Sequence, residues 1–299
     1  MGILNVTPDS FSDGGRYTSV QAALDRAAQM AASGAAILDI GGESTRPRGT
    51  TYGAGAEAVS LGEELERVVP VIEAIARGLP DVLLSVDTYK GAVARAALRA
   101  GAHMVNDVTG LRHGVGTAHA AAEYGAPLVV MHAVGKPGEM VHVQASGDIV
   151  ADVTASLERS VARAREAGVR DVIVDAGFGF GKASGDNLRL VSETDRLRQR
   201  LGCPVLVGAS RKSTIGQVLG GDGPPVPVGE RAWGSVGLAV AAALRGASIV
   251  RVHDVAETAQ ALRLALAAEA ERWDDAPLAP EAQGPHHAHT PEAAFHVRA

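Results

Sequence analysis

The chain has 299 residues, a formal net charge of −6 and one cysteine. This mild acidity without clustered lysine and arginine argues against a nucleic-acid partner. A single cysteine excludes a disulfide framework and a cysteine-based zinc site. The N-terminal MGILNVTPDS has no basic leader, and no apolar run reaches the ~18 residues that a membrane span needs. We therefore expect a soluble, cytoplasmic protein that binds neither nucleic acid nor membrane.

Short apolar segments rich in valine, isoleucine and leucine recur along the chain, each flanked by Gly, Pro, Asn or Asp. Such segments are typical of strands that are buried on both faces of a parallel sheet. They predict eight strands, over residues 2–6, 36–41, 82–87, 104–108, 128–132, 172–177, 205–210 and 249–254. The first begins almost at residue 1 with nothing before it to cover its N-terminal end, which is consistent with a sequence that starts further upstream.

Amphipathic patterns lie between these segments, for example over 20–33, 62–78 and 152–168, and several end at a glycine suited to a helix C-terminus. Eight helix candidates alternate with the eight strands over residues 1–273. This alternation predicts a parallel sheet with helical crossovers, and eight repeats favour a single-domain α/β fold, the (β/α)8 TIM barrel. An open doubly wound sheet is the alternative, and neither fold names a function.

Residues 274–299 differ from the rest, because they are polar, rich in proline and alanine, and without periodicity. They contain four of the ten histidines. We interpret this segment as a disordered tail, with metal binding as the alternative reading.

Polar residues collect where the predicted strands end. In a barrel these ends meet at one mouth, where the chemistry takes place. A single acid at such a position can be structural, capping the next helix or pairing with an arginine of a neighbouring strand. The polar residues at these ends are Asn5, Asp39, Asp87, Asn106, Asp107, His132, Asp175, Ser210, Arg211, Lys212, Ser213, Arg251, His253 and Asp254.

Asp87, Asn106 and Asp175 end three of these strands, which makes a purely structural role for all three a poor explanation. A carboxylate accepts two parallel N–H bonds from an amidine-like edge. An asparagine adds one donor and one acceptor, as a ring nitrogen beside an N–H requires. The trio therefore predicts a flat heterocycle with several N–H donors.

A cationic set faces the same mouth, and glycine pairs at 14–15 and 41–42 let backbone N–H groups approach an anion. The segment GFGFGK (177–182) is not a phosphate-binding P-loop. Together these features predict a phosphate or pyrophosphate at the second end of the ligand. The cationic residues are Arg46, Lys212, Arg251 and His253.

The same segments resemble those of the dihydropteroate synthases, in order and over the whole predicted barrel. The matching blocks are MGILNVTPDSFSDGG (1–15), LDIGGESTRP (38–47), SVDTYK (85–90), NDVTG (106–110), VMH (130–132), DAGFGFGK (175–182), GASRKSTIG (208–216) and IVRVHDV (249–255). The resemblance implies a TIM barrel, a homodimer and Mg²⁺. It also implies condensation of a 7,8-dihydropterin that carries a CH2–pyrophosphate with 4-aminobenzoate, giving 7,8-dihydropteroate and pyrophosphate.

The resemblance also implies roles for individual residues. Asp87, Asn106 and Asp175 would hold the pterin, Asp175 at its 2-amino/N3 edge and Lys212 near its carbonyl. Asn5, Arg251 and His253 would bind pyrophosphate and Mg²⁺, with Asn5 as the metal ligand. The 4-aminobenzoate pocket would comprise Thr45, Pro47, Phe180, Ser210 and Lys212, with Phe11, Asp13 and Arg46 on closing loops. The catalytic residues would be Lys212, Asp87, Asp175 and Arg251.

Three departures from the family pattern occur, at Ala176, at Arg48 and over residues 131–137. The last two border binding loops and put 4-aminobenzoate affinity and sulfonamide response in doubt. One rival interpretation is a pterin-binding methyltransferase that uses methyltetrahydrofolate and a corrinoid, which has no need of the SRKS block. Another is a pterin-binding protein without turnover, against which a retained pyrophosphate site argues.

Lysine is scarce, with four among 28 basic residues. Besides Lys212, we expect Lys182 to order the GFGFGK loop, and Lys90 and Lys136 to be incidental surface charges. We expect His132 and Cys203 to pack structurally, and both tryptophans, Trp233 and Trp273, to pack on helices.

Overall fold

The computed structural model describes residues 1–6, 16–43, 59–134 and 147–271. Within these ranges, eight strands pair in chain order, and every pairing is parallel. They are β1 (Gly2–Asn5), β2 (Ile37–Gly41), β3 (Leu83–Asp87), β4 (Met104–Asp107), β5 (Leu128–Met131), β6 (Val172–Asp175), β7 (Val205–Val207) and β8 (Ile249–Val250).

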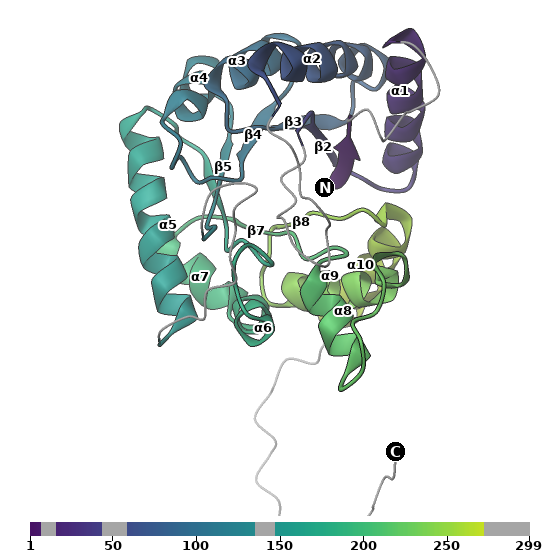
Figure 1. Ribbon diagram of the computed structural model, residues 1–299, viewed down its shortest axis with the longest axis vertical. Coiled ribbons are helices and arrows are strands. Elements are labelled where there is room, and N and C mark those ends of the chain that lie inside the picture. The colour runs from purple at the N-terminus through teal and green to yellow at the C-terminus, as the bar shows by residue number, and fades with distance from the viewer. Residues whose placement is uncertain (7–15, 44–58, 135–146, 272–299) are drawn as a thin grey trace, which may run out of the picture.

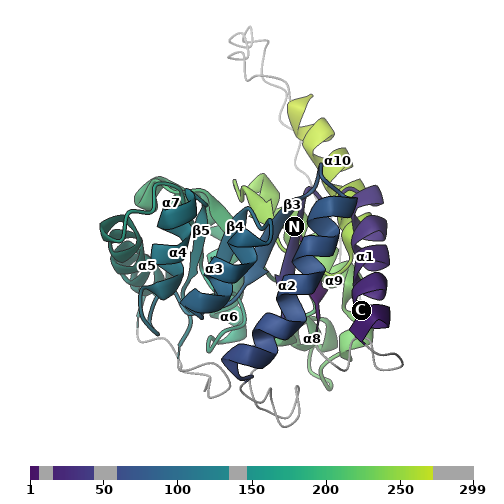
Figure 2. The same ribbon diagram turned by 90° about the horizontal axis from the view of Figure 1, so that it is seen from above.

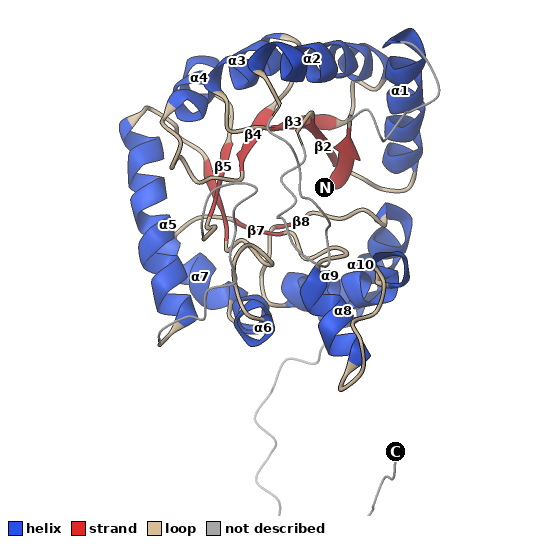
Figure 3. Ribbon diagram, viewed as in Figure 1, coloured by secondary structure: helices blue, strands red, loops and turns tan. Residues whose placement is uncertain are grey.

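The sheet closes on itself immediately after β8. Val252 forms a parallel bridge with Gly2, its N–H donates to the Met1 carbonyl at 2.9 Å, and its carbonyl accepts from the Ile3 N–H at 3.0 Å. Figures 1 and 3 accordingly show a ring of strands inside a ring of helices. The prediction of a (β/α)8 barrel is confirmed, and the open sheet is wrong.

The described residues contain ten α-helices where the sequence predicted eight, and these helices form the outer layer of the barrel (Figure 2). Two crossovers carry a pair of helices each: the first pair divides at Glu193, and a segment rich in glycine and proline separates the second pair. The helices are α1 (Arg16–Ala32), α2 (Leu61–Gly78), α3 (Gly91–Arg99), α4 (Gly116–Tyr124), α5 (Ile149–Glu166), α6 (Ser184–Ser192), α7 (Thr194–Leu201), α8 (Ser213–Gly220), α9 (Ala232–Leu244) and α10 (Val255–Ala270).

The interior of the barrel is layered because side chains alternate along each strand. Met104, Val129, Ile173 and Leu206 form a buried apolar cluster from four neighbouring strands. Residues two positions further along a strand share its face. Asn106 and Asp175 therefore lie above Met104 and Ile173, towards the carboxyl ends of the strands. The apolar layer thus supports the polar mouth.

The helices bury one face each against the strands. In α2, Val68, Val71, Ile72 and Ile75 are buried at helical spacing. The Ser60 side chain caps this helix, accepting the Glu63 N–H at 3.3 Å. None of the helices in the described part of the chain combines the length and apolarity needed to cross a bilayer. The predicted tail, 274–299, lies outside the described residues.

Candidate active site

One arginine connects three strands at the mouth of the barrel. Arg251, just after β8, donates from Nε to Asp39 Oδ2 at 2.6 Å and from Nη2 to Asp87 Oδ2 at 2.8 Å. Asp39 Oδ2 also accepts from Asn106 Nδ2 at 3.0 Å. The structure thus brings together Asp87, Asn106 and Arg251, as the sequence predicted.

Asp39 belongs to this network; the sequence placed it among the polar residues of the strand ends but gave it no role in binding or catalysis. It lies in the middle of β2 and is fully buried. The signal that could have found it is an acid inside an otherwise apolar strand, since a carboxylate is not buried without a partner. Its partner Arg251 lies 212 residues further along the chain, which hides the pair from local patterns.

Burial dominates the electrostatics of Asp87 and raises its pKa to about 7. Arg251 opposes this rise, while Asp39, Glu64 and Asp107 add to it, Asp39 the most. Within the described residues, Oδ1 of Asp39 and Oδ1 of Asp87 are buried without a hydrogen-bond partner. Buried acceptors without partners are costly, so the mouth is suited to a ligand that supplies donors.

Asp175 ends β6 and faces the same mouth. Its Oδ1 accepts the Gly177 N–H at 2.7 Å, and burial raises its pKa against the opposing effect of Lys212. A Cβ placed at Gly208 would lie 3.9 Å from Asp175 Oδ2 and 3.7 Å from Arg251 Cβ. The absence of a side chain at Gly208 therefore leaves space between the carboxylate of Asp175 and the aliphatic part of Arg251.

Lys212 precedes α8 and reaches back over the loop that follows β6. Its Nζ donates to the Phe178 carbonyl and lies 4.1 Å from the centre of the Phe180 ring. Burial lowers its pKa to about 7, although Asp175 acts in the opposite direction. Lys212 thus lies beside Asp175 and Phe180, where the sequence placed it.

Lys182 orders this loop from within, and the prediction for it is confirmed. Its side chain is 2% exposed, and Nζ donates to the carbonyls of Gly177 at 2.7 Å, Phe180 at 3.2 Å and His132 at 3.3 Å. At Gly177, where φ is +69°, a Cβ would lie 1.7 Å from the His132 carbonyl oxygen. Only glycine fits there, and the Lys182 contacts tie this tight turn to the rest of the loop.

Ser210 and His253 connect the seventh and eighth strand ends. Ser210 Oγ accepts the backbone N–H of His253 at 3.1 Å and lies 3.0 Å from its Nδ1. Next to them, Arg211 forms an ion pair with Asp254.

Asn5 ends β1, and a Cβ placed at Gly41 would lie 3.8 Å from Asn5 Oδ1 and 3.7 Å from Asp87 Oδ2. These predicted residues therefore share the mouth.

Five predicted site residues lie outside the described residues, so their placement stays a prediction. They are Phe11, Asp13, Thr45, Arg46 and Pro47. No group of three or more His, Cys, Asp or Glu side chains arranged to hold a metal ion occurs within 1–6, 16–43, 59–134 and 147–271.

Two smaller predictions are wrong. Lys90 is not a solvated surface charge: its Nζ donates to the carboxylates of Glu43 and Glu64 and to the Val59 carbonyl, and Glu64 is 1% exposed. Its partners come from other segments, so the local pattern could not reveal them. Trp233 does not pack, because it is 75% exposed.

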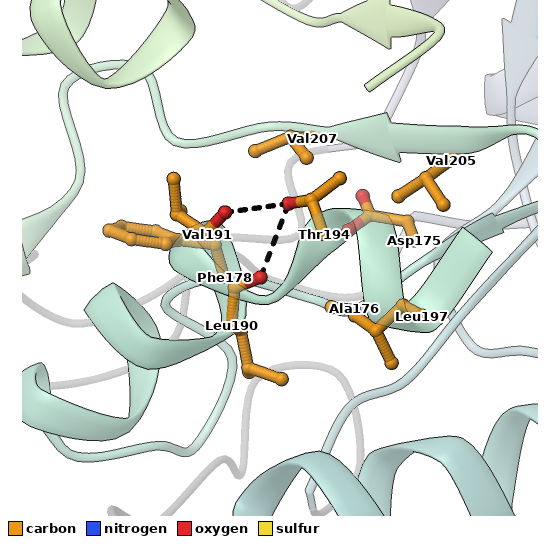
Figure 4. A pocket seen from close by; sticks show the side chains of 9 residues that line it. All are labelled: Asp175, Ala176, Phe178, Leu190, Val191, Thr194, Leu197, Val205 and Val207. Atoms are coloured by element: carbon orange, nitrogen blue, oxygen red, sulfur yellow. Dashed lines mark hydrogen bonds between the residues drawn. The ribbon is translucent and has the colours of Figure 1, made fainter. Parts of the chain in front are cut away.

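A small cavity behind Asp175 is not the substrate site. It is lined by Asp175, by Ala176 and Phe178 of the loop after β6, by Val205 and Val207 of β7, and by residues of α6 and α7. Figure 4 shows Thr194, one of these residues, donating to the carbonyls of Leu190 and Val191. Its volume of about 10 Å³ corresponds to a single water. The polar mouth on the inner side of the strands is the candidate site.

Comparison with known proteins decides between the families that use such a mouth. The family model described as pterin binding enzyme matches residues 1–253. Dihydropteroate synthase from Escherichia coli K12 is 45% identical over 266 residues, 88% of this chain and 89% of that protein. The Bacillus subtilis 168 enzyme of the same name is 46% identical, covering 88% and 86%. The chain belongs to the dihydropteroate synthases.

Solved structures of this family agree. Xanthomonas albilineans dihydropteroate synthase with 4-aminobenzoic acid has a TM-score of 0.79 and 46% identity, covering 90% of this chain and 92% of that one. The same enzyme in complex with 7,8-dihydropteroate has a TM-score of 0.76 and 42% identity, covering 90% and 93%. The resemblance drawn from the sequence motifs is therefore confirmed, and with it the barrel.

Proposed function

We propose that this chain condenses a 7,8-dihydropterin bearing a CH2–pyrophosphate with 4-aminobenzoate, giving 7,8-dihydropteroate and pyrophosphate. The relatives named dihydropteroate synthase, and the solved structures with 4-aminobenzoic acid and with 7,8-dihydropteroate, support this reaction. The observation that carries it is the convergence of Asp87, Asn106, Asp175 and Lys212 at one mouth beside Arg251.

The pterin would bind through its N–H edge. Asp175 Oδ2 faces the space over Gly208 and would accept from the 2-amino group and N3, while Lys212 would donate to the pterin carbonyl. Asp87 and Asn106 would take the opposite side of the ring. The lowered pKa of Lys212 and the raised pKa of Asp87 both reflect the desolvated mouth, where such bonds are strong.

In the reaction, the C–O bond to pyrophosphate breaks and the leaving group takes the electron pair. The aniline nitrogen then forms the new C–N bond and releases a proton. Because the dihydropterin is electron-rich and stabilises a cation, the main requirement is charge stabilisation of the leaving group. Arg251 and His253 would take this role, and the aniline would need correct placement rather than activation.

Magnesium fits the oxygen donors of this mouth. Asn5 Oδ1 and Asp87 Oδ2 flank Gly41, where the lack of a side chain leaves room between them. Mg²⁺ is held by one or two protein oxygens together with substrate phosphates and water, so a full protein cage is not required. Asn5 would be its ligand, and the ion would supply positive charge to the pyrophosphate.

The 4-aminobenzoate would lie over Phe180, with Ser210 and Lys212 at its edge. Phe180 and Lys212 are already in contact, and Ser210 is fixed by His253. The contributions of Phe11, Asp13, Thr45, Arg46 and Pro47 stay predictions from the family resemblance.

We also propose a homodimer that forms through α8, α9 and α10. Among the described residues, most exposed large apolar side chains lie on this side of the barrel, and α9 packs against both α8 and α10 (Figure 1). Exposed apolar patches of this kind mark interfaces. The residues are Val218, Leu219, Val228, Trp233, Leu244, Leu264 and Leu266. Sedimentation velocity should show a dimer that Trp233→Glu dissociates; a monomeric wild type would contradict it.

The reaction is tested by mixing the purified protein with dihydropterin pyrophosphate, 4-aminobenzoate and Mg²⁺. Pyrophosphate release that depends on 4-aminobenzoate, with dihydropteroate formed in equal amount, is the expected result. Release without 4-aminobenzoate, or no release, would overturn the proposal. A matched reaction with methyltetrahydrofolate and a corrinoid tests the methyltransferase alternative.

A further inference from the structure

Asp39 lies beneath the ligand-binding side chains and contacts two of them. It is fully buried in β2, two residues before the end of the strand. One oxygen, Oδ2, accepts both the Asn106 amide at 3.0 Å and Arg251 Nε at 2.6 Å. Asp39 is thus the point at which the heterocycle-binding and the anion-binding parts of the mouth are joined.

The contact with Asn106 determines which way its amide faces. A side-chain amide has a donor end and an acceptor end of nearly the same shape, and its orientation follows from its partners. A carboxylate only accepts, so Asp39 requires the nitrogen of Asn106 to face it. The oxygen of Asn106 is then directed away from Asp39, as an acceptor for a ligand N–H.

The contact with Arg251 determines the plane of the guanidinium. Nε binds Asp39 while Nη2 binds Asp87 Oδ2 at 2.8 Å, so two carboxylates from neighbouring strands hold the group from two sides. A guanidinium is planar, and two fixed contacts therefore fix the direction of its remaining donors, two on Nη1 and one on Nη2. Those donors are outside both contacts.

We propose that Asp39 is a positioning residue that turns the oxygen of Asn106 towards the ligand and aligns Arg251 for an anion. It thereby selects a heterocycle that presents an N–H donor at Asn106. This inference rests on the proposed function and extends it to a residue that need not touch the substrate. A role in stability alone is the competing explanation, and buried ion pairs are weak evidence for stability.

Asp107 provides a matched control for that competing explanation. It is 1% exposed and follows Asn106 directly in β4. Its carboxylate accepts hydrogen bonds from Thr109 and Thr117 rather than from site residues. Replacing it removes an equally buried carboxylate without touching Asn106 or Arg251. Substitutions at Asp39 and at Asp107 should therefore both affect folding, whereas only those at Asp39 should affect ligand binding.

The test measures the Kd of 7,8-dihydropteroate by isothermal titration calorimetry, with steady-state kinetics and the unfolding midpoint of each variant. Asp39→Leu removes the acceptor and should raise the Kd by about thirtyfold or more. Asp39→Asn can keep an oxygen towards Asn106 and Arg251 but not the charge, and should raise the Kd by about fivefold. Asp107→Asn should leave the Kd within about twofold of the wild type, even where it lowers the unfolding midpoint.

The KM values give the second readout. In Asp39→Asn, the KM for the dihydropterin substrate should rise while the KM for 4-aminobenzoate stays unchanged. If Asp39→Leu does not fold, Asp39→Asn decides the question. Wild-type Kd and KM in folded Asp39 variants, or equal losses in Asp107→Asn, would overturn the positioning role alone. A wild-type protein that neither binds dihydropteroate nor releases pyrophosphate would instead overturn the proposed function, and with it this inference.

Discussion

The Nζ atom of Lys212 lies 4.1 Å from the centre of the Phe180 ring, which connects the loop after β6 with the start of α8. The same ammonium donates to the Phe178 carbonyl. A compact ammonium can make both contacts and still point a third donor into the mouth. Burial lowers its pKa to about 7, while Asp175 acts in the opposite direction and favours the ammonium form.

Replacing Lys212 by arginine should reduce kcat/KM by about tenfold or more, because a planar guanidinium is bulkier and cannot occupy the same position over Phe180. Lys212→Met, which keeps the length but removes the donor, should reduce it by about a hundredfold or more. Pyrophosphate release measures both variants, and an unchanged unfolding midpoint shows that the loop is intact. Full activity in Lys212→Arg would exclude a specific role for the ammonium.

Substitutions of Asp175 and of Arg251 should weaken the binding of different ligands, since the two side chains would face different ends of the proposed substrate. Asp175→Asn is expected to weaken 7,8-dihydropteroate binding by about tenfold or more, because its carboxylate would hold the pterin edge. Arg251→Ala should weaken dihydropterin pyrophosphate binding more than it weakens dihydropteroate, which has no pyrophosphate. Calorimetric titration with each ligand gives the comparison. Identical losses on dihydropteroate in both variants would contradict this division of roles.

The strands and the main site residues could be predicted because both depend on local pattern. Alternation along a strand places Asn106 above Met104 and Asp175 above Ile173, so the polar position at each strand end is visible in the sequence. The closure of the barrel follows from counting repeats. The break between α6 and α7 at Glu193 could not be predicted from the sequence, because the residues around it are compatible with a continuous helix.

Interactions between distant segments could not be predicted in the same way. Asp39 and Arg251 are paired across 212 positions, and Lys90 binds Glu43 and Glu64 across 47 and 26. Nothing in the sequence near Lys90 distinguishes it from a surface lysine, because its burial is created by α2 and the end of β2. Only the packed structure shows that these charges are paired.

Lys90 should therefore matter for stability. Lys90→Met leaves the buried carboxylate of Glu64 without its cation, and we expect a loss of about 3 kcal/mol in the free energy of unfolding, measured by urea denaturation. The double variant Lys90→Met/Glu64→Gln removes the more deeply buried of the two carboxylates that Lys90 binds, Glu64 rather than Glu43, and should recover part of this loss. The exposed pair Arg95–Glu123 is the control, since Arg95→Met should cost less than about 1 kcal/mol. Equal losses at Lys90 and Arg95 would show that burial of the pair is unimportant.

His132 should make the protein sensitive to acid. Burial lowers its pKa from 6.5 to about 3, with Lys182 and Arg112 adding to the effect. Between these two values the unfolded chain binds a proton that the folded chain does not, so the free energy of unfolding falls as the pH falls from 6.5 towards 3. One pKa unit corresponds to about 1.4 kcal/mol, so the loss attributable to His132 between pH 7.5 and pH 5 is about 2 kcal/mol.

His132→Gln cannot take up this proton and should lose about 2 kcal/mol less than the wild type between pH 7.5 and pH 5. Urea denaturation at both pH values measures the difference, and contributions from other titrating groups cancel because both proteins share them. His119→Gln, on an exposed position of α4, is the matched control and should keep the full acid sensitivity of the wild type, since His132 is still present. Parallel loss of stability in the wild type and in His132→Gln would mean that His132 is protonated in the folded protein without cost.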